Sequence, residues 1–186
     1  MHPELEKALK VLKRGGLIVY PTDTVWGIGC DATNAEAVDR VFALKQRDDS
    51  KALICLVSDF RMLEQYISSI PEVAYDILKY ADRPTTIVYD QPRHVAENLI
   101  AEDDSLGVRI TDNEFCRSII KYLKKPLVST SANISGQPTP GMFKEIDQAI
   151  LDGVDYVVNL DRNKKNDRPS SVIRLKNDGT VQVIRK

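Results

Sequence analysis

Residues 33–57 read TNAEAVDRVFALKQRDDSKALICLV, and this stretch decides the fold. Thr33 followed by Glu36 predicts a capping box, and apolar residues then recur at helical spacing to about Gln46. The apolar run at residues 53–57 predicts a buried strand. A capped helix followed directly by a short buried strand is typical of an α/β protein.

Three cations, Lys45, Arg47 and Lys51, lie where this helix passes into a loop. Positive charges held close together repel one another, and a ligand with several anionic oxygens would relieve the repulsion. The same loop carries Asp48 and Asp49, so it equally fits a solvated charged turn. The pattern leaves a polyphosphate site and a charged surface turn both open.

Helix and strand signals alternate over most of the remaining sequence. Helices are predicted at residues 3–14, 59–66, 71–80, 113–123 and 143–151, and strands at 17–20, 85–89, 106–110, 127–130, 156–159, 171–175 and 181–185. The loop at 22–30 leaves room for one more short strand, and residues 177–179 predict a hairpin turn. The charge-dense run 161–168 is predicted to be a mobile loop. This alternation predicts one α/β domain over residues 1–186, with a mixed sheet and helices on its faces.

The composition argues against several classes of protein. A formal net charge of -1 gives no overall attraction to nucleic acid, so an RNA contact would need a local basic patch. Cys30, Cys55 and Cys116 are far apart, which favours buried thiols in a reducing compartment over a disulfide framework or a zinc site. The N-terminus lacks a signal-peptide core, and no apolar run approaches the roughly 20 residues that span a bilayer. We therefore expect a cytoplasmic protein that is not embedded in a membrane.

Two clusters of small polar side chains follow predicted strands. Residues 129–133 read Ser-Thr-Ser-Ala-Asn, and ligands of open α/β sheets bind at the carboxyl ends of strands. Residues 21–24 read Pro-Thr-Asp-Thr and offer two hydroxyls and a carboxylate to a small polar ligand. Both clusters equally fit turns whose side chains hydrogen-bond to their own backbone.

Arg109 lies in an otherwise apolar strand. Because an unpaired buried charge is very costly, Arg109 must either pair with an acid of the protein or hold an anionic ligand, for which a carboxylate is the natural choice. No histidine pair and no nucleophile with a companion base stands out in the sequence. The pattern therefore favours charge neutralisation and positioning, as in phosphoryl or nucleotidyl transfer.

Gly27 and Gly29 fit a G-x-G-x-x-A pattern of the kind that binds dinucleotides. Six residues separate this pattern from the preceding strand, and no acid ends the next strand. Close packing of the backbone is therefore the favoured interpretation of these glycines.

Taken together, these motifs resemble the YrdC-like family, the threonylcarbamoyl-AMP synthases. The matching segments follow the family's order along nearly the whole chain: residues 16–29, 44–47 with Lys51, 106–109, 126–136 and 169–171. The resemblance is to the short, single-domain form. It implies one α/β domain with a twisted mixed β-sheet around a concave, positively lined cleft.

The resemblance also implies an activity. L-threonine, bicarbonate (or carbon dioxide) and ATP, with Mg²⁺, would give L-threonylcarbamoyl-AMP and pyrophosphate. A tRNA-modifying transferase machinery would then move the threonylcarbamoyl group to adenosine 37 of tRNA. A direct contact of this chain with tRNA is left open.

Specific residues are implied by the family's motifs. The K-x-R and S-x-N pairs, which face each other in the cleft, match Lys45 with Arg47 and Ser131 with Asn133, and these four would be catalytic. The resemblance assigns ATP to Arg47, Lys51, Ser105, Ser131, Thr139 and Arg185. It assigns threonine to Thr24, Arg109, Ser129 and Ser171. No residue is expected to ligate a metal.

Some positions depart from the family's usual pattern. Asp48 and Ala52 replace prolines that many members have, Leu56 stands where many carry a threonine-contacting histidine, and the segment 82–86 is altered. Two alternatives therefore stay open. One is a non-catalytic RNA-binding module that uses the same basic cleft, and the other is a paralogue that acts on another carbamoyl or nucleotide substrate.

Overall fold

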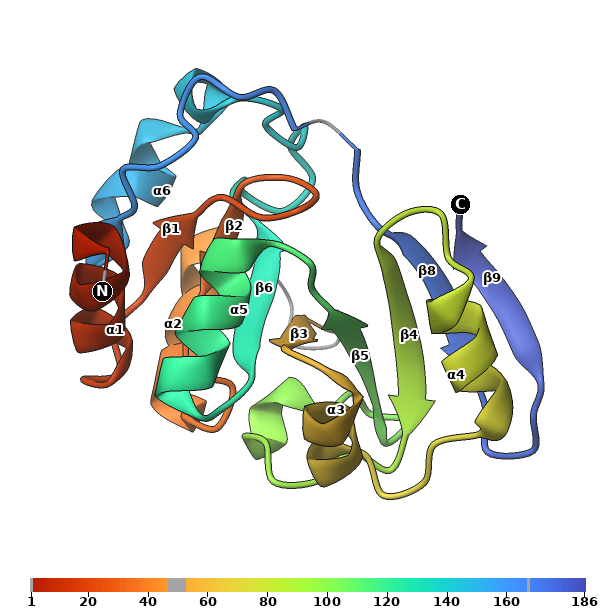
Figure 1. Cartoon of the computed structure of the whole chain (residues 1–186). Helices are drawn as coiled ribbons and strands as arrows, with labels where there is room; N and C mark the ends of the chain where they lie inside the picture. Colours follow the sequence, from red (N-terminus) through yellow and green to blue (C-terminus); the bar gives the residue numbers. More distant parts are fainter. Residues whose placement is uncertain (1, 47–52, 167) are drawn as a thin grey trace.

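A computed structural model describes residues 2–46, 53–166 and 168–186. In this part of the chain, one mixed sheet has the strand order β7-β1-β2-β6-β3-β5-β4-β8-β9 (Figure 1). The strands are β1 Ile18–Tyr20, β2 Gly27–Gly29, β3 Ile54–Val57, β4 Thr85–Asp90, β5 Ser105–Ile110, β6 Leu127–Ser131, β7 Tyr156–Val157, β8 Ser171–Leu175 and β9 Val181–Arg185. The pairs β1–β7, β3–β5 and β4–β8 are parallel, and the other neighbouring pairs are antiparallel. The prediction of a mixed sheet is confirmed.

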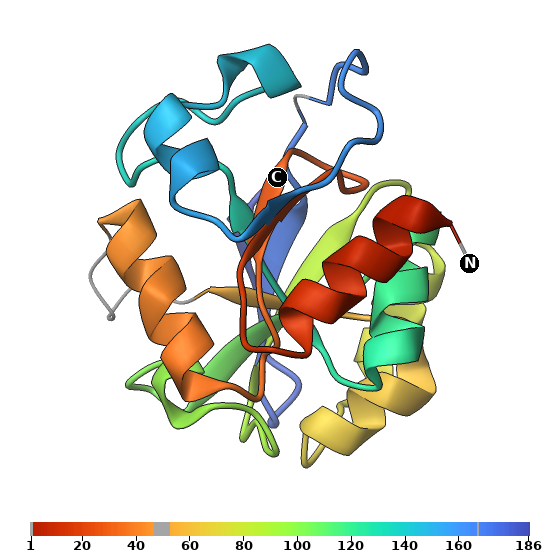
Figure 2. The ribbon, with the colours of Figure 1, turned by 90° about the vertical axis from the view of Figure 1, so that its left-hand side faces the viewer.

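Helices cover the sheet on both sides, with α1 and α5 on one side and α2 on the other (Figure 2). The helices are α1 Pro3–Leu12, α2 Ala35–Lys45, α3 Phe60–Tyr66, α4 Glu72–Lys79, α5 Glu114–Leu123 and α6 Gln148–Asp152, with 3₁₀ turns η1 Glu97–Leu99 and η2 Phe143–Glu145. Helix α1 packs against α5 and β1 because its apolar residues recur on one buried face, as the sequence predicts. Among the described residues, every helix is too short or too polar to cross a bilayer.

The start of α2 differs from the prediction by one residue. Asn34 is the N-cap, and its side-chain oxygen accepts a hydrogen bond of 3.1 Å from the backbone N–H of Ala37. Thr33 does not cap the helix because its hydroxyl donates to Asp31 over 2.7 Å. The capping box expected from Thr33 and Glu36 is therefore wrong, although the helix itself is confirmed.

The helix predicted over residues 143–151 is interrupted. Asp147 has an extended backbone with ψ of 138°, and its carboxylate accepts from the N–H of Ala149 over 2.8 Å. Asp147 thus starts a new helix, α6, and separates it from the turn η2. A capping residue inside an apolar periodic pattern explains the error.

The packing role of Gly29 is confirmed. A Cβ atom there would lie 2.6 Å from the carbonyl oxygen of Val128 and 2.7 Å from the Tyr20 ring. Strand β2 can therefore approach β6 only with glycine at this position. These glycines bring strands together in the sheet and do not form the strand-to-helix turn of a dinucleotide site.

Candidate active site

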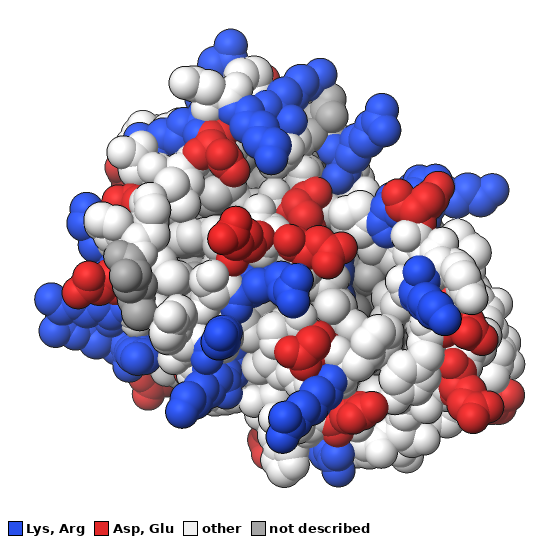
Figure 3. Space-filling model, viewed as in Figure 1, with Lys and Arg blue, Asp and Glu red and all other residues white. Residues whose placement is uncertain are grey.

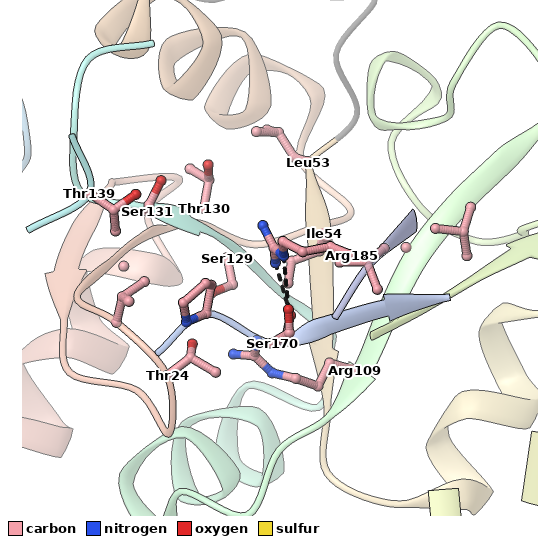
Figure 4. Close-up of a pocket in the computed structure, with 16 residues that line it drawn as sticks. Thr24, Leu53, Ile54, Arg109, Ser129, Thr130, Ser131, Thr139, Ser170 and Arg185 are labelled. Atoms are coloured by element: carbon pink, nitrogen blue, oxygen red, sulfur yellow. Dashed lines mark hydrogen bonds between the residues drawn. The ribbon is translucent and has the colours of Figure 1, made fainter. Parts of the chain in front are cut away.

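A cavity of about 340 Å³ lies against the sheet, and seven strands contribute to its lining: β2, β3, β4, β5, β6, β8 and β9. Gly107 and Arg109 both line it because alternate residues of β5 point to the same face. The site therefore occupies the face of the sheet as well as the ends of strands. Six residues of the predicted site line it together (Figure 4): Thr24, Arg109, Ser129, Ser131, Thr139 and Arg185.

The sequence left two alternatives for Arg109, an acid of the protein as its partner or an anionic ligand, and the structure is compatible with both. Its side chain is 3% exposed, and its Nη2 donates to Asp23 Oδ1 over 3.0 Å, so it has an internal ion-pair partner. It also lines the cavity, and its Nε has no hydrogen-bond partner among the residues that the structure describes. A buried donor without a partner is uncommon in proteins, and together with the place of Arg109 in the cavity lining it marks this residue as a candidate for ligand contact.

Arg185, at the end of β9, faces the same hollow (Figure 4). Its Nε donates to the carbonyl oxygen of Ser170 over 2.9 Å, and its Nη2 donates to Ser170 Oγ over 3.3 Å. Burial and then the positive charge of Arg109 lower the pKa of Arg185. The two guanidinium groups destabilise one another, and an anion between them would remove that cost.

Hydroxyl groups form the opposite wall of the cavity (Figure 4). In the loop between β1 and β2, Thr22 Oγ1 donates to the carbonyl oxygen of Val25 over 2.7 Å and accepts from the N–H of Thr24 over 3.0 Å. Thr22 therefore forms the turn, while Thr24 lines the cavity. The polar cluster at residues 21–24 is both a self-bonded turn and part of the site.

The end of α2 lies against the corner that follows β6. The Lys45 side chain is buried, and its Nζ donates to the carbonyl oxygens of Ser131 and Asn133 over 2.6 Å each. The N–H of Ser135 donates to the carbonyl oxygen of Lys45 over 2.8 Å. This end of α2 thus meets the Ser131–Asn133 corner by direct contact and not across the cavity, because neither Lys45 nor Asn133 is part of the cavity lining. Arg47 lies outside the described residues.

Two hydrogen bonds from its amide nitrogen hold the side chain of Asn133 in place. Its Nδ2 donates to the carbonyl oxygens of Ile134 and Gln137 over 3.0 and 2.8 Å. Its Oδ1 is buried and, in the described part of the chain, has no hydrogen-bond partner. Asn133 therefore has one buried, unsatisfied acceptor in the corner, and it is not part of the cavity lining.

The other predicted site residues lie elsewhere. Ser105 is on the same face of β5 as Arg109 but is not part of the cavity lining, and its hydroxyl donates to Asp103 over 2.5 Å. Ser171 lines a second hollow behind β8, and its neighbour Ser170 reaches the cavity instead. Lys51 lies outside the described residues.

Two residues of the site were not assigned a role from the sequence. Asp23 was seen only as part of a polar cluster, because nothing in the sequence links it to Arg109, 86 positions away. The sequence assigned the site to Ser171 and not to Ser170. Neighbouring residues of an extended chain point to opposite faces of a sheet, and the sequence does not show which of the two serines faces the cavity.

Nucleophilic side chains near the cavity are not activated. Burial, and the negative charge of Asp23 next, raise the pKa of the Cys116 thiol. Burial is also the main cause that raises the pKa of the Tyr20 hydroxyl. Within residues 2–46, 53–166 and 168–186, no group of three or more His, Cys, Asp and Glu side chains could hold a metal ion. The site offers fixed positive charge and hydrogen bonds.

The fold and this site define an α/β protein with a hydroxyl- and guanidinium-lined hollow suited to an anionic ligand. The chain belongs to the Sua5/YciO/YrdC family, which carries the description "Telomere recombination" and whose model matches residues 10–186. A Pseudomonas aeruginosa protein named threonylcarbamoyl-AMP synthase is 34% identical over 152 residues, which are 81% of this chain and 82% of that protein. A Vibrio campbellii protein of the same name is 32% identical over 184 residues, which are 97% of each chain.

Solved structures show the same fold. The crystal structure of P. abyssi Sua5 complexed with L-threonine has a TM-score of 0.81 and 27% identity, and covers 92% of this chain and 50% of that one. The chain thus spans about half the length of that Sua5 protein. The crystal structure of E. coli YciO has a TM-score of 0.85 and 25% identity, and covers 98% of this chain and 88% of that one.

Proposed function

We propose that this chain is an L-threonylcarbamoyladenylate synthase, which joins L-threonine, carbon dioxide from bicarbonate, and ATP, and releases pyrophosphate. The observation that carries the proposal is that Arg109 and Arg185 face hydroxyl groups across one cavity, in a family whose members include proteins named threonylcarbamoyl-AMP synthase. The product would supply a transferase machinery that modifies adenosine 37 of tRNA in the cytoplasm. Three buried, unpaired cysteines support a reducing compartment.

The threonine end of the cavity is assigned to Arg109, Thr24 and Ser129. Arg109 lines the cavity and carries a guanidinium of which one edge is held by Asp23, so it can hydrogen-bond to the carboxylate of the amino acid. The hydroxyls of Thr24 and Ser129 line the same cavity and can hydrogen-bond to the rest of the amino acid. The L-threonine complex of P. abyssi Sua5 supports this choice of substrate.

The nucleotide end is assigned to Arg185, Ser131 and Thr139, which line the cavity. Mg²⁺ would enter with ATP as part of that substrate and neutralise charge on the phosphates. The threonine amine attacks carbon dioxide and loses a proton to form a carbamate. A carbamate oxygen then attacks the α-phosphorus, and pyrophosphate leaves. Fixed cations stabilise the charge that builds on the phosphates, and no protein nucleophile is required.

Mass spectrometry of the product formed from ATP, L-threonine and labelled bicarbonate tests this proposal. We expect a threonylcarbamoyl-AMP mass that carries the label, and release of pyrophosphate that needs both L-threonine and bicarbonate. Pyrophosphate release that is the same without L-threonine would overturn the proposal.

Replacement of Arg109 by alanine should lower kcat/KM for L-threonine about 100-fold, since a charge-assisted hydrogen bond contributes about 1.5–3 kcal/mol. The matched control is Arg117→Ala, which removes the same charge from the exposed face of α5. If the two variants had equal kcat/KM for L-threonine, Arg109 would not bind that substrate.

A paralogue with another substrate is a second candidate, favoured by Leu56. This residue is fully buried and apolar where many family members carry a histidine. The match to YciO covers 98% of this chain. A panel of amino acids offered with ATP and labelled bicarbonate separates the two candidates, because a paralogue would prefer another substrate to L-threonine.

The RNA-binding alternative gains no support from Figure 3, where cationic and anionic side chains are interspersed over the visible face.

A further inference from the structure

We infer that Asp23 is a positioning residue that holds Arg109 in place for the carboxylate of the amino-acid substrate and keeps phosphate away from it. The inference rests on the proposed function, because it assigns a task to Arg109 within that site. It concerns a residue that lies beside Arg109 and is not part of the cavity lining.

Asp23 is anchored on both of its oxygens. Its Oδ1 accepts from Arg109 Nη2 over 3.0 Å. Its Oδ2 accepts from Thr111 Oγ1 over 3.2 Å and from the backbone N–H of Asp112 over 3.4 Å. The carboxylate therefore ties the loop between β1 and β2 to the end of β5. Since Oδ2 is fixed, the position of Oδ1 is fixed as well, and with it one edge of the guanidinium.

This arrangement leaves Arg109 only partly paired. The side chains of Arg109 and Asp23 are 3% and 13% exposed, so water does little to satisfy the remaining donors. Asp23 takes a hydrogen bond from Nη2, while the buried Nε has no partner among the described residues. An ion pair with only a structural role would be more stable if both the Nη2 and the Nε donors of Arg109 had acceptors. The hydrogen bond to Asp23 instead fixes one edge of the guanidinium of a residue that also lines the cavity.

Asp23 also sets the charge that a ligand meets. Arg185 faces the same cavity, and the positive charge of Arg109 contributes to lowering its pKa, so the two cations act on one another. Asp23 offsets the charge of Arg109 at one end of the cavity and leaves Arg185 to act on the other. A singly charged carboxylate fits the end that Asp23 offsets, while a phosphate with more charge is repelled by the acid. Asp23 would thereby separate the threonine end from the nucleotide end.

The test compares Asp23→Ala and Asp23→Asn with wild type in the threonine-dependent pyrophosphate assay. We expect Asp23→Ala to raise KM for L-threonine about tenfold and to leave KM for ATP unchanged. The effect is smaller than that of Arg109→Ala because the arginine is still present but is no longer held by its hydrogen bond to Asp23. Inorganic phosphate should become a stronger competitor of L-threonine in both variants. The matched control is Asp112→Asn, an exposed acid whose backbone N–H donates to Asp23 and is kept in the variant.

A double-mutant cycle shows whether Asp23 acts through Arg109. In an Arg109→Ala background, Asp23→Ala should cause no further loss of L-threonine binding, measured by calorimetry. Additive losses, or equal rises in KM for L-threonine and ATP, would overturn the inference in favour of a general structural role. If Asp23→Ala does not fold, the isosteric Asp23→Asn variant carries the same comparison.

The two proposals fail in different ways. A wild-type chain without threonine-dependent pyrophosphate release overturns the proposed function, and the inference with it. An active wild type whose Asp23→Asn and Asp23→Ala variants match it in KM for L-threonine overturns the inference alone.

Discussion

The contacts of Lys45 give this side chain a structural role, and its catalytic role stays a prediction. Its ammonium is buried and donates to two backbone carbonyl oxygens, those of Ser131 and Asn133, over 2.6 Å each. These bonds hold the end of α2 against the loop that follows β6. A cation at this position raises the potential beside the cavity and also fixes the corner that forms the cavity wall.

We predict that Lys45→Met lowers the free energy of unfolding by about 3 kcal/mol, because methionine keeps the apolar volume but removes two charge-assisted hydrogen bonds. The carbonyl oxygen of Asn133 loses its Lys45 donor, while that of Ser131 keeps the backbone N–H of Asn133 at 2.9 Å. Urea unfolding measures the change, and Lys121→Met, at an exposed position of α5, is the matched control. Equal unfolding midpoints for the two variants would mean that the Lys45 contacts do not stabilise the corner. Loss of activity without loss of stability would assign Lys45 to catalysis alone.

Individual elements were predictable wherever a local pattern decides them. The cap at Asp59 and the strand at β3 follow from short-range signals and are confirmed. The single helix expected at residues 143–151 is wrong because the apolar period continues across Asp147, which caps a second helix. The choice of Ser171 over Ser170 has the same origin, since a motif match does not reveal which way each residue of a strand points.

The segment from β7 to β8 is tied to the site by Asn166. Its backbone N–H donates to the carbonyl oxygen of Gly141 over 2.8 Å, and its Nδ2 donates to the carbonyl oxygen of Thr22 over 3.1 Å. One residue thus joins the loop that carries Thr24 to the loop that carries Thr139. The two ends of the proposed substrate site are linked outside the sheet.

We predict that Asn166→Ala speeds hydrogen exchange at residues 22–25, because the bond to Thr22 is lost, and costs about 1 kcal/mol of stability at most. Asn163→Ala, exposed in the same segment, is the control and should leave exchange unchanged. Unchanged exchange at residues 22–25 in Asn166→Ala would show that the link does not hold this loop.

The site as a whole depends on contacts that no local pattern encodes. Its lining comes from seven strands and four connecting segments that are brought together by the strand order of the sheet. From the sequence, Arg109 could be recognised as needing a partner, but Asp23 and Arg185 could not be placed beside it. The resemblance to a family brought Arg185 and Thr139 into the predicted site, and the structure places both in the cavity lining. Arg47 and Lys51 stay predictions, since they lie outside the described residues.

Two guanidinium groups, those of Arg109 and Arg185, face one hollow, so a bound anion should stabilise the whole fold by mass action. At an ATP concentration 100 times Kd the gain is about 2.7 kcal/mol, or about 5–10 °C in the melting temperature of a chain of this size. We predict that Arg185→Ala loses at least half of that rise, because it removes the cation assigned to the nucleotide, while Arg14→Ala, exposed beyond α1, keeps all of it. Differential scanning fluorimetry with and without MgATP measures the effect, with sodium chloride at matched ionic strength to remove screening. An equal rise in melting temperature in both variants would show that the nucleotide does not bind at Arg185, and Arg185 would then have no role in the proposed reaction.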